Sequence, residues 1–140
     1  MTLAVERPLS GTRSSRLRTL LERAFFTQDS VLKIMLNSRN ECYFQWGWKT
    51  PAGWAWKKVK FNDMELGELL LVLEGKKENV AFFHSFDGKE GKTTTQIWVN
   101  RSGDYCTFKV KECSKGLNEG EQRVLQQLLG HAIVMMSLTL

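Results

Sequence analysis

The sequence predicts an α+β fold in which an antiparallel β-sheet carries helices packed on one of its faces. Two observations predict it. Six strand-like segments are separated by turns, and in 54–61, 93–100 and 105–111 apolar residues alternate with a period of two, as in the strands of an antiparallel sheet. In two further segments they recur three to four residues apart, as in amphipathic helices, and each of these segments follows a group of three strands. With a helix at the start, the expected order of elements is α-βββα-βββα.

The chain has the length and composition of a single domain of this kind. Its 140 residues are 42% hydrophobic and 25% charged, so we expect a packed core and no global disorder. We expect residues 1–12 to be a flexible tail and residues 13–140 to form one α+β domain. There is no apolar run of roughly 18 residues that predicts a transmembrane helix, and no apolar N-terminal segment that predicts a secretory signal.

The first predicted element is a short basic helix over residues 13–26. Leu17, Leu20 and Leu21 have helical spacing, and four arginines lie around the other faces. Two interpretations of this helix remain open. It is either a surface helix exposed to solvent or a basic arm that contacts an acidic polymer.

The first group of strands precedes a leucine-rich helix. The expected strands are residues 31–36, 42–49 and 54–61, with turns at 37–40 and 50–53 that make them an antiparallel meander. The period then changes, and residues 63–75 are predicted to be a helix. Asn62 or Asp63 is suited to cap its start, and Gly75 to end it.

The second group repeats this order. The expected strands are residues 80–86, 93–100 and 104–112, with a glycine-rich hairpin tip at 87–92. A longer helix over residues 118–137 follows, with Asn118 as its cap. The tripeptides Lys58-Val59-Lys60 and Lys109-Val110-Lys111 each end the third strand of a group, which indicates a weak internal duplication.

Three of these strands carry similar side chains on the face opposite the apolar one, namely Trp or Tyr, Lys, and hydrogen-bonding Thr, Gln or Asn. We expect these faces to form an open sheet surface that contacts a ligand. The predicted contact residues are Trp54, Trp56, Lys58, Lys60, Trp98, Tyr105, Lys109 and Lys111. Lys89 and Lys92 at the hairpin tip, and Arg101 in the next turn, are expected to close over the ligand; the alternative for the tip is a solvated turn.

Exposed aromatic rings interleaved with lysines suit single-stranded nucleic acid. Bases stack on such rings at about 1–3 kcal/mol each, and lysines neutralise phosphates and release counterions. A duplex hides its base faces, and the net charge of +5 is only modestly basic, so the placement of the charge matters more than its sum. The alternative is that aromatic residues pack in the core or across strands, and Phe44, Trp46 and Trp48, which share one face, are the first candidates for it.

Catalytic and metal-binding motifs are lacking. His84 and His131 have no Ser, Cys or Asp at a spacing typical of catalysis. The cysteines, Cys42, Cys106 and Cys113, are odd in number and form no CxxC pair, so we expect free thiols in a reducing cytosol. We therefore expect no enzymatic activity, no metal, no cofactor and no membrane partner, and a cytoplasmic location, associated with the nucleoid if the source is prokaryotic.

Two segments carry a resemblance to a known superfamily. In WAWKKVKFNDMELGELLLVLEG and TFKVKECSKGLNEGEQRVLQQLLG, a basic strand leads into a polar cap and a leucine-rich helix. This pattern, within about residues 31–137, resembles the Whirly and positive-cofactor-type (transcriptional coactivator) single-stranded DNA-binding proteins; certain archaeal single-stranded DNA-binding proteins are a second candidate. In that superfamily a helix follows each curved antiparallel sheet. The resemblance implies binding of single-stranded DNA, or of a guide-RNA-like strand, across the β-surface, with assembly through helices.

We therefore expect a single-stranded DNA-binding protein with little sequence preference, acting in a process such as replication or repair. Two alternatives use the same surface: an RNA-binding protein or transcription cofactor, and a module whose aromatic face docks a partner protein. The C-terminal helix has a wide apolar stripe that includes Leu128, Ile133 and Met136, which predicts a homodimer or larger assembly through this helix. Burial of the stripe within its own domain is the alternative.

Overall fold

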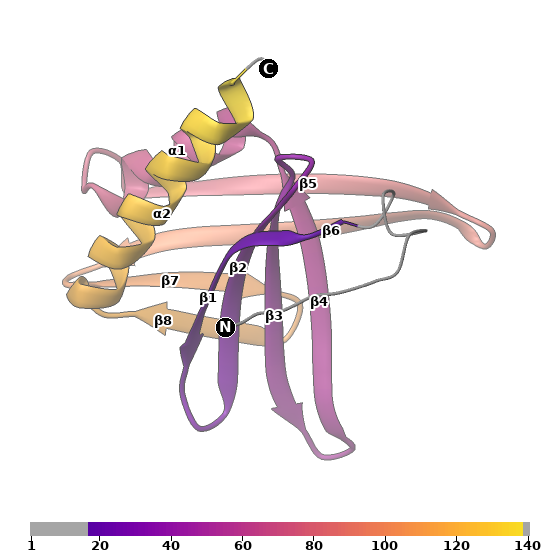
Figure 1. Ribbon diagram of the computed structural model, residues 1–140. Helices are drawn as coiled ribbons and strands as arrows, with labels where there is room; N and C mark the ends of the chain where they lie inside the picture. Colours follow the sequence, from indigo (N-terminus) through magenta and orange to yellow (C-terminus); the bar gives the residue numbers. More distant parts are fainter. Residues whose placement is uncertain (1–16, 139–140) are drawn as a thin grey trace, which may run out of the picture.

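The computed structural model describes residues 17–138, which fold into two units of the same construction (Figure 1). Each unit is a four-stranded antiparallel sheet with its strands in sequential order, followed by one helix. The first sheet contains β1 (Thr19–Phe26), β2 (Ser30–Asn37), β3 (Cys42–Thr50) and β4 (Gly53–Phe61), followed by α1 (Asp63–Leu73). The second sheet contains β5 (Asn79–Gly88), β6 (Gly91–Ser102), β7 (Tyr105–Val110) and β8 (Cys113–Leu117), followed by α2 (Glu119–Ser137). The α+β class is confirmed, whereas the predicted tail over residues 1–12 lies outside the described residues.

The predicted helix over residues 13–26 is wrong where the structure describes it, because residues 19–26 form strand β1. This strand pairs with β2 and places Phe25 opposite Leu32, where both are buried. Leu21 and Phe25 are four residues apart, a spacing that puts two side chains on one face of a helix and also of a strand. The short pattern therefore fits both structures, and pairing with β2 selects the strand.

The second sheet contains a strand that the predicted order α-βββα-βββα lacks. Strand β7 ends at Val110 rather than at residue 112, and Lys111 turns the chain with a left-handed φ of 51°. Strand β8 then runs back beside β7 and turns Cys113, Lys115 and Leu117 inward. A lysine at a core position breaks the alternation of apolar and polar residues, which is why the pattern does not reveal this strand.

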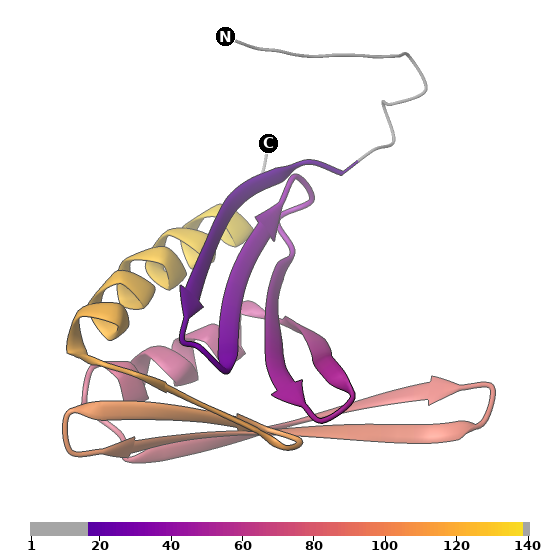
Figure 2. The same cartoon turned by 90° about the horizontal axis from the view of Figure 1, so that it is seen from below.

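The core lies where the two sheets cross, with both helices on one side (Figures 1 and 2). Phe44 of β3 stacks on Phe61 of β4 at a centroid distance of 4.6 Å and also contacts Phe108 of the second sheet. Trp46 and Trp48 are buried beside them, so core packing, the alternative left open by the sequence, applies to residues 44, 46 and 48.

The three cysteines are free thiols buried in this core. Burial raises the pKa of the Cys42 thiol to about 12 and that of Cys106 to about 11. At neutral pH both are therefore uncharged and act as small apolar side chains rather than as nucleophiles.

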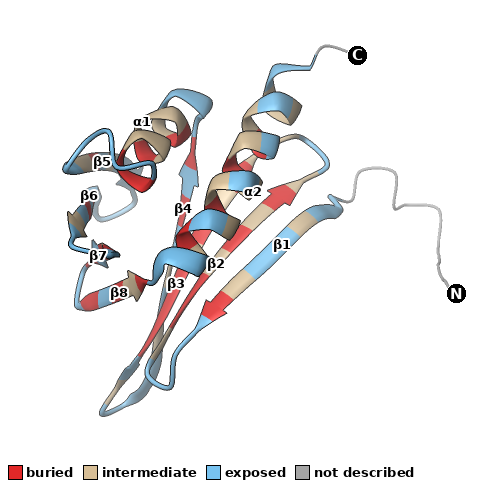
Figure 3. Cartoon of the chain, turned by 90° about the vertical axis from the view of Figure 1, so that its left-hand side faces the viewer, coloured by how far each residue is buried: buried red, intermediate tan, exposed pale blue. Residues whose placement is uncertain are grey.

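Both helices begin with the same reciprocal cap, and their buried sides face the sheets (Figure 3). The Asn62 side chain accepts from the backbone N–H of Glu65 at 2.8 Å, and the Glu65 carboxylate accepts from the N–H of Asn62 at 3.0 Å. Asn118 and Glu121 repeat this arrangement at the start of α2. Such caps contribute about 1 kcal/mol each. Among the described residues, neither helix combines the length and the apolar character needed to span a membrane.

Lys115 is an unusual occupant of the core. It lies on β8 opposite Phe108, only 1% of its surface is exposed, and its ammonium nitrogen has no hydrogen-bond partner among the described residues. Burial lowers the pKa of Lys115 below its ordinary value of 10.5, and the nearby carboxylate of Glu121 opposes part of this shift. The folded chain therefore holds this proton less tightly than the unfolded chain does.

We predict that Lys115→Met raises the free energy of unfolding by about 1–3 kcal/mol at neutral pH, because it removes an unpaired buried polar group and keeps the side-chain volume. A lysine whose pKa falls on folding lowers the free energy of unfolding most at low pH, and this destabilisation decreases as the pH rises towards 10.5. The difference in the free energy of unfolding between Lys115→Met and the wild type should therefore decrease as the pH rises through the alkaline range. Urea unfolding of both proteins at several pH values measures this, and a destabilised variant would contradict it.

Candidate nucleic-acid interface

Two tryptophans form an exposed platform on the outer face of the first sheet. Trp54 and Trp56 lie two residues apart on β4, and 44% and 55% of their surfaces are exposed. Their rings stack on each other with a centroid distance of 5.8 Å and an angle of 25° between their planes. We call this pair the tryptophan platform. Its rings are therefore held in place before any ligand arrives.

A glycine on the neighbouring strand makes room for the platform. Gly47 of β3 pairs with Trp56, and the six-membered ring of the indole lies over it. A Cβ atom at position 47 would lie 2.7 Å from Cε3 and 2.9 Å from Cη2 of Trp56, which is too close. On the far side of Gly47 lies Val31 of β2, and Phe26 of β1 lies opposite Val31, so one apolar row crosses the whole sheet.

One lysine lies beside the platform on the neighbouring strand, and another follows it along β4. Lys49 of β3 is paired with Trp54, and Lys58 follows Trp56 on the same face of β4. The ammonium group of Lys58 lies 4.6 Å from the centroid of the Tyr43 ring, a favourable cation–π geometry. Neither Lys49 nor Lys58 forms an ion pair with another described residue. The platform thus lies between two cations that are available to an anionic ligand.

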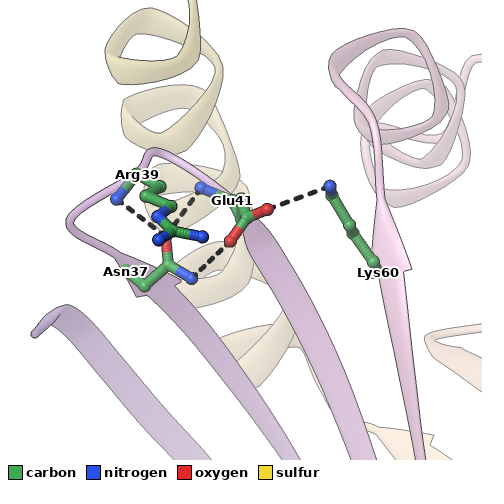
Figure 4. Close-up of polar contacts among 4 residues, drawn as sticks. All are labelled: Asn37, Arg39, Glu41 and Lys60. Carbon is green, nitrogen blue, oxygen red and sulfur yellow. Dashed lines mark hydrogen bonds and ion pairs between the residues drawn. The ribbon is translucent and has the colours of Figure 1, made fainter. Parts of the chain in front are cut away.

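Lys60 differs from these lysines because a carboxylate already binds it (Figure 4). Its Nζ donates to Glu41 Oε2 at 3.1 Å, and the amide of Asn37 donates to Glu41 Oε1 at 2.9 Å. These two donors hold the pKa of Glu41 below its usual range, with the Asn37 contact the larger cause. Glu41 therefore stays charged at neutral pH, and a phosphate must compete with it for Lys60.

The second sheet has its own aromatic outer face. Trp98 of β6 is 43% exposed, meets Phe83 of β5 edge to face, and is paired with Lys109 of β7. Tyr105 of β7 lies against Gly116 of β8, where a Cβ would come within 3.4 Å of its ring. Lys109 is the cation beside Trp98 on this face, whereas Lys92, farther along β6, is paired with Asp87 near the hairpin tip.

The prediction that these residues form one continuous open surface is therefore wrong, because they belong to two separate sheets. Trp54, Trp56 and Lys58 belong to the first sheet, whereas Trp98, Tyr105 and Lys109 belong to the second, and the strands of the two sheets cross (Figure 1). Period-two alternation correctly assigns the outward side chains of each strand, but it carries no information about which strands share a sheet.

The remaining predicted cations lie at turns or on the opposite face. Lys89 and Lys92 lie at the tip of the β5–β6 hairpin, which extends beyond β4 (Figure 2). Lys111 lies in the turn between β7 and β8 rather than on a strand face. These three side chains are exposed, but none adjoins the tryptophan platform through strand pairing.

Arg101 holds structural elements together instead of facing an open surface. It lies on the helix side of β6, where its guanidinium donates to the backbone carbonyls of Val72 and Leu73 at 2.7–3.0 Å. It also donates to Gln122 of α2 at 2.9 Å. The last turn of α1 has no basic residue of its own, so Arg101 satisfies its free carbonyls. We therefore leave Arg101 out of the proposed interface.

A cleft forms where the β5–β6 hairpin passes the edge of β4. We call this space the cleft; its volume is about 400 Å³. Its lining residues are Lys57, Lys58, Val59 and Lys60 from β4 and His84, Ser85, Phe86, Thr93 and Thr95 from the hairpin. Sequence reasoning did not identify Lys57 or Phe86 as site residues. No local signal marks them, because the cleft exists only through the crossing of two sheets distant in sequence.

The two histidines differ in their surroundings. His84 Nε2 lies 2.8 Å from Glu65 Oε2, and its ring packs near Phe61, so it connects β5 to the first turn of α1. His131 lies on the exposed side of α2. Within residues 17–138, no three or more His, Cys, Asp or Glu side chains group as metal ligands would.

Comparison with known proteins identifies the fold. No protein-family model matches the chain, and no curated protein matches it. Among solved structures, one from the crystal structures of Trypanosoma brucei MRP1/MRP2 has a TM-score of 0.59 and 14% identity, with 89% of this chain and 88% of that chain covered. A guide-RNA-binding protein complex bound to a guide RNA gives a TM-score of 0.60 and 14% identity over 89% of this chain and 95% of that chain. At this identity the similarity establishes a shared fold.

We predict that Gly47→Ala displaces the Trp56 ring and disrupts its stacking on Trp54, because the added methyl group occupies the space of the indole. The near-ultraviolet circular dichroism of the coupled indoles should weaken. Gly67→Ala is the matched control, since a Cβ at position 67 meets nothing within 4 Å. The control should keep the spectrum and stabilise α1 by up to about 1 kcal/mol. An unchanged spectrum for Gly47→Ala would contradict the platform geometry.

Proposed function

We propose that this protein binds single-stranded nucleic acid on the outer face of its first sheet, with RNA as the favoured ligand. One observation carries the proposal: the tryptophan platform is exposed, prearranged by Gly47 and flanked by Lys49 and Lys58. Two bases can stack on the rings while the lysines contact the adjoining phosphates. A ring that is already held in place loses little freedom on binding, which favours affinity.

The chemistry of the platform favours a single strand over a duplex. A duplex buries the base faces that stacking requires and offers mainly phosphates and groove edges. Flat aromatic rings accept any base, so sequence preference is expected to be weak. The guide-RNA-binding protein complex with this fold supports a nucleic-acid ligand, and its bound guide RNA is the reason for testing RNA before DNA. Single-stranded DNA, the ligand expected from the sequence, is the second ligand to test.

The architecture also supports a distant relationship to the Whirly and positive-cofactor-type proteins. Each unit of this chain is an antiparallel sheet followed by a helix, and the unit occurs twice. We propose this relationship on the arrangement of elements.

We predict that Trp54→Ala combined with Trp56→Ala weakens binding of an oligouridylate at least about tenfold, because each stacking contact contributes about 1–3 kcal/mol. Lys58→Gln should lower the slope of log affinity against log salt by about 0.7. Fluorescence anisotropy of end-labelled oligouridine, oligodeoxyuridine and a duplex at two salt concentrations measures both effects and the preference for ribose.

Trp98→Ala is the matched control for this experiment, since Trp98 is almost as exposed as Trp54 but lies on the other sheet. Undiminished affinity in the double variant would contradict the platform assignment. Failure of the wild-type chain to bind any of the oligonucleotides would instead favour a module that docks a protein.

We propose in addition that the protein forms a homo-oligomer through the C-terminal half of α2. Part of the apolar stripe of α2 is buried within its own domain. The core of the chain contains Leu125, Leu129 and Ala132, and Ile133 packs partly against it. Val134, on the same helix, is exposed. The exposed apolar side chain of Val134 supports a contact with a second copy of the chain on this side of α2.

We predict that Val134→Asp reduces the molar mass measured by light scattering to that of a monomer, because it places a charge in an apolar contact. Gln127→Asp, an exposed polar position on the same helix, should leave the mass unchanged. A wild-type chain that is monomeric at every concentration would contradict the assembly.

A further inference from the structure

The cleft combines a charged wall with an aromatic floor. The wall is the edge of β4, where Lys57 and Lys58 point to opposite faces of the strand and both line the cleft. The floor is the part of the β5–β6 hairpin that extends past β4 (Figure 2). Its volume of about 400 Å³ falls within the ~300–1,000 Å³ typical of small-ligand sites.

Phe86 is the exposed aromatic residue of this floor. It lies on the same face of β5 as the buried Phe82, yet 72% of its surface is exposed. Neighbouring positions of this face are covered by the first sheet, but position 86 lies beyond that cover, opposite Thr93. A ring on the core-facing side of a strand is therefore left open to a ligand.

His84 fixes the inner end of the cleft. Its ring lies between Phe61 and the Glu65 carboxylate, which holds Nε2 at 2.8 Å. Because Glu65 also caps α1, the floor is tied to the first turn of this helix and to the end of β4. The cleft is thus a built feature of the crossing and not the space beside a loose hairpin.

The cations of the wall differ in their availability. Lys60 is bound by Glu41. Lys57 and Lys58 form no ion pair with another described residue. Lys58 also belongs to the face of the tryptophan platform, and a strand rise of ~3.4 Å per residue places it about 7 Å beyond Trp56. The platform and the cleft therefore share a cation and lie on one continuous path along β4.

We propose that the cleft is a subsite for one nucleotide of the bound strand, adjacent to the nucleotides stacked on the platform. Its base stacks on Phe86, and its phosphate contacts Lys57 and Lys58. The proposal rests on the function proposed above and extends it, because it assigns a base contact away from the outer face of the first sheet. The unpaired cations favour a phosphate, the exposed ring favours a base, and the hydroxyls of Ser85 and Thr93 suit the sugar between them.

The chain offers two matched pairs of variants to test this subsite. Phe86→Ala removes the floor ring, whereas Phe83→Ala removes an exposed ring from the opposite face of the same strand. Lys57→Gln removes a cation that lines the cleft but points away from the outer face, whereas Lys49→Gln removes one from the outer face alone. Thermal unfolding of each variant checks that it is folded.

The decisive measurement uses the shortest oligouridylate that binds the wild-type chain with full affinity. Phe86→Ala should weaken its binding by about 5- to 150-fold, the range expected for one lost stacking contact, and Phe83→Ala should not. A set of the same oligomer with one abasic position moved along it locates the contact. In the wild-type chain, an abasic position weakens binding wherever a base would stack. For Phe86→Ala, one abasic position should no longer weaken binding, and for Trp56→Ala a different position should no longer do so.

The outcomes separate this inference from the function on which it rests. If no oligonucleotide binds the wild-type chain, both proposals fail. If the platform variants and Lys49→Gln weaken binding while Phe86→Ala and Lys57→Gln bind like the wild type, the cleft proposal alone is overturned. The cleft proposal would also be overturned if the same abasic position ceased to weaken binding in both Phe86→Ala and Trp56→Ala, because the two rings would then contact one base.

Discussion

The aromatic contacts of Phe61 hold the two sheets at their crossing point. Phe61 ends β4, stacks on Phe44 of its own sheet, and meets Phe82 and His84 of β5 at centroid distances of 5.2 and 5.5 Å. This cluster determines where the second sheet passes under the first, and therefore how far the β5–β6 hairpin extends beyond β4. Along β4 the cleft lies between this fixed point and the tryptophan platform, so the relative position of the two sites follows from it.

Polar groups complete the junction on the helix side. Arg101 and Gln126 donate to the last carbonyls of α1, and Gln122 links Arg101 to α2 while donating to the backbone of Asp104 and Leu117. The amide and guanidinium groups buried here are thus satisfied by backbone acceptors, as buried polar groups require. One side of the crossing is closed by hydrogen bonds, and the other remains open to a ligand.

Local patterns in the sequence were sufficient for part of this arrangement. Alternation placed Trp54, Trp56 and Trp98 on outward faces, and the cap residues Asn62 and Asn118 marked both helices. Strand β1 was not predicted because a short segment fits the period of a helix or of a strand until its partner strand is known. Strand β8 was not predicted because a buried lysine interrupts the alternation of apolar and polar residues. The cleft, the role of Arg101 and the division of the aromatic residues between two sheets depend on contacts between distant segments, which no local pattern contains.

Strand β4 is an edge of its sheet, and this position has a consequence for the free protein. An edge strand offers backbone N–H and C=O groups to which a strand of another chain can pair, which is a common route to aggregation. Lys57 and Lys58 place positive charge along this edge, and the hairpin of β5 and β6 passes across it. The same lysines that suit a phosphate backbone thus also discourage the addition of a strand from a second molecule.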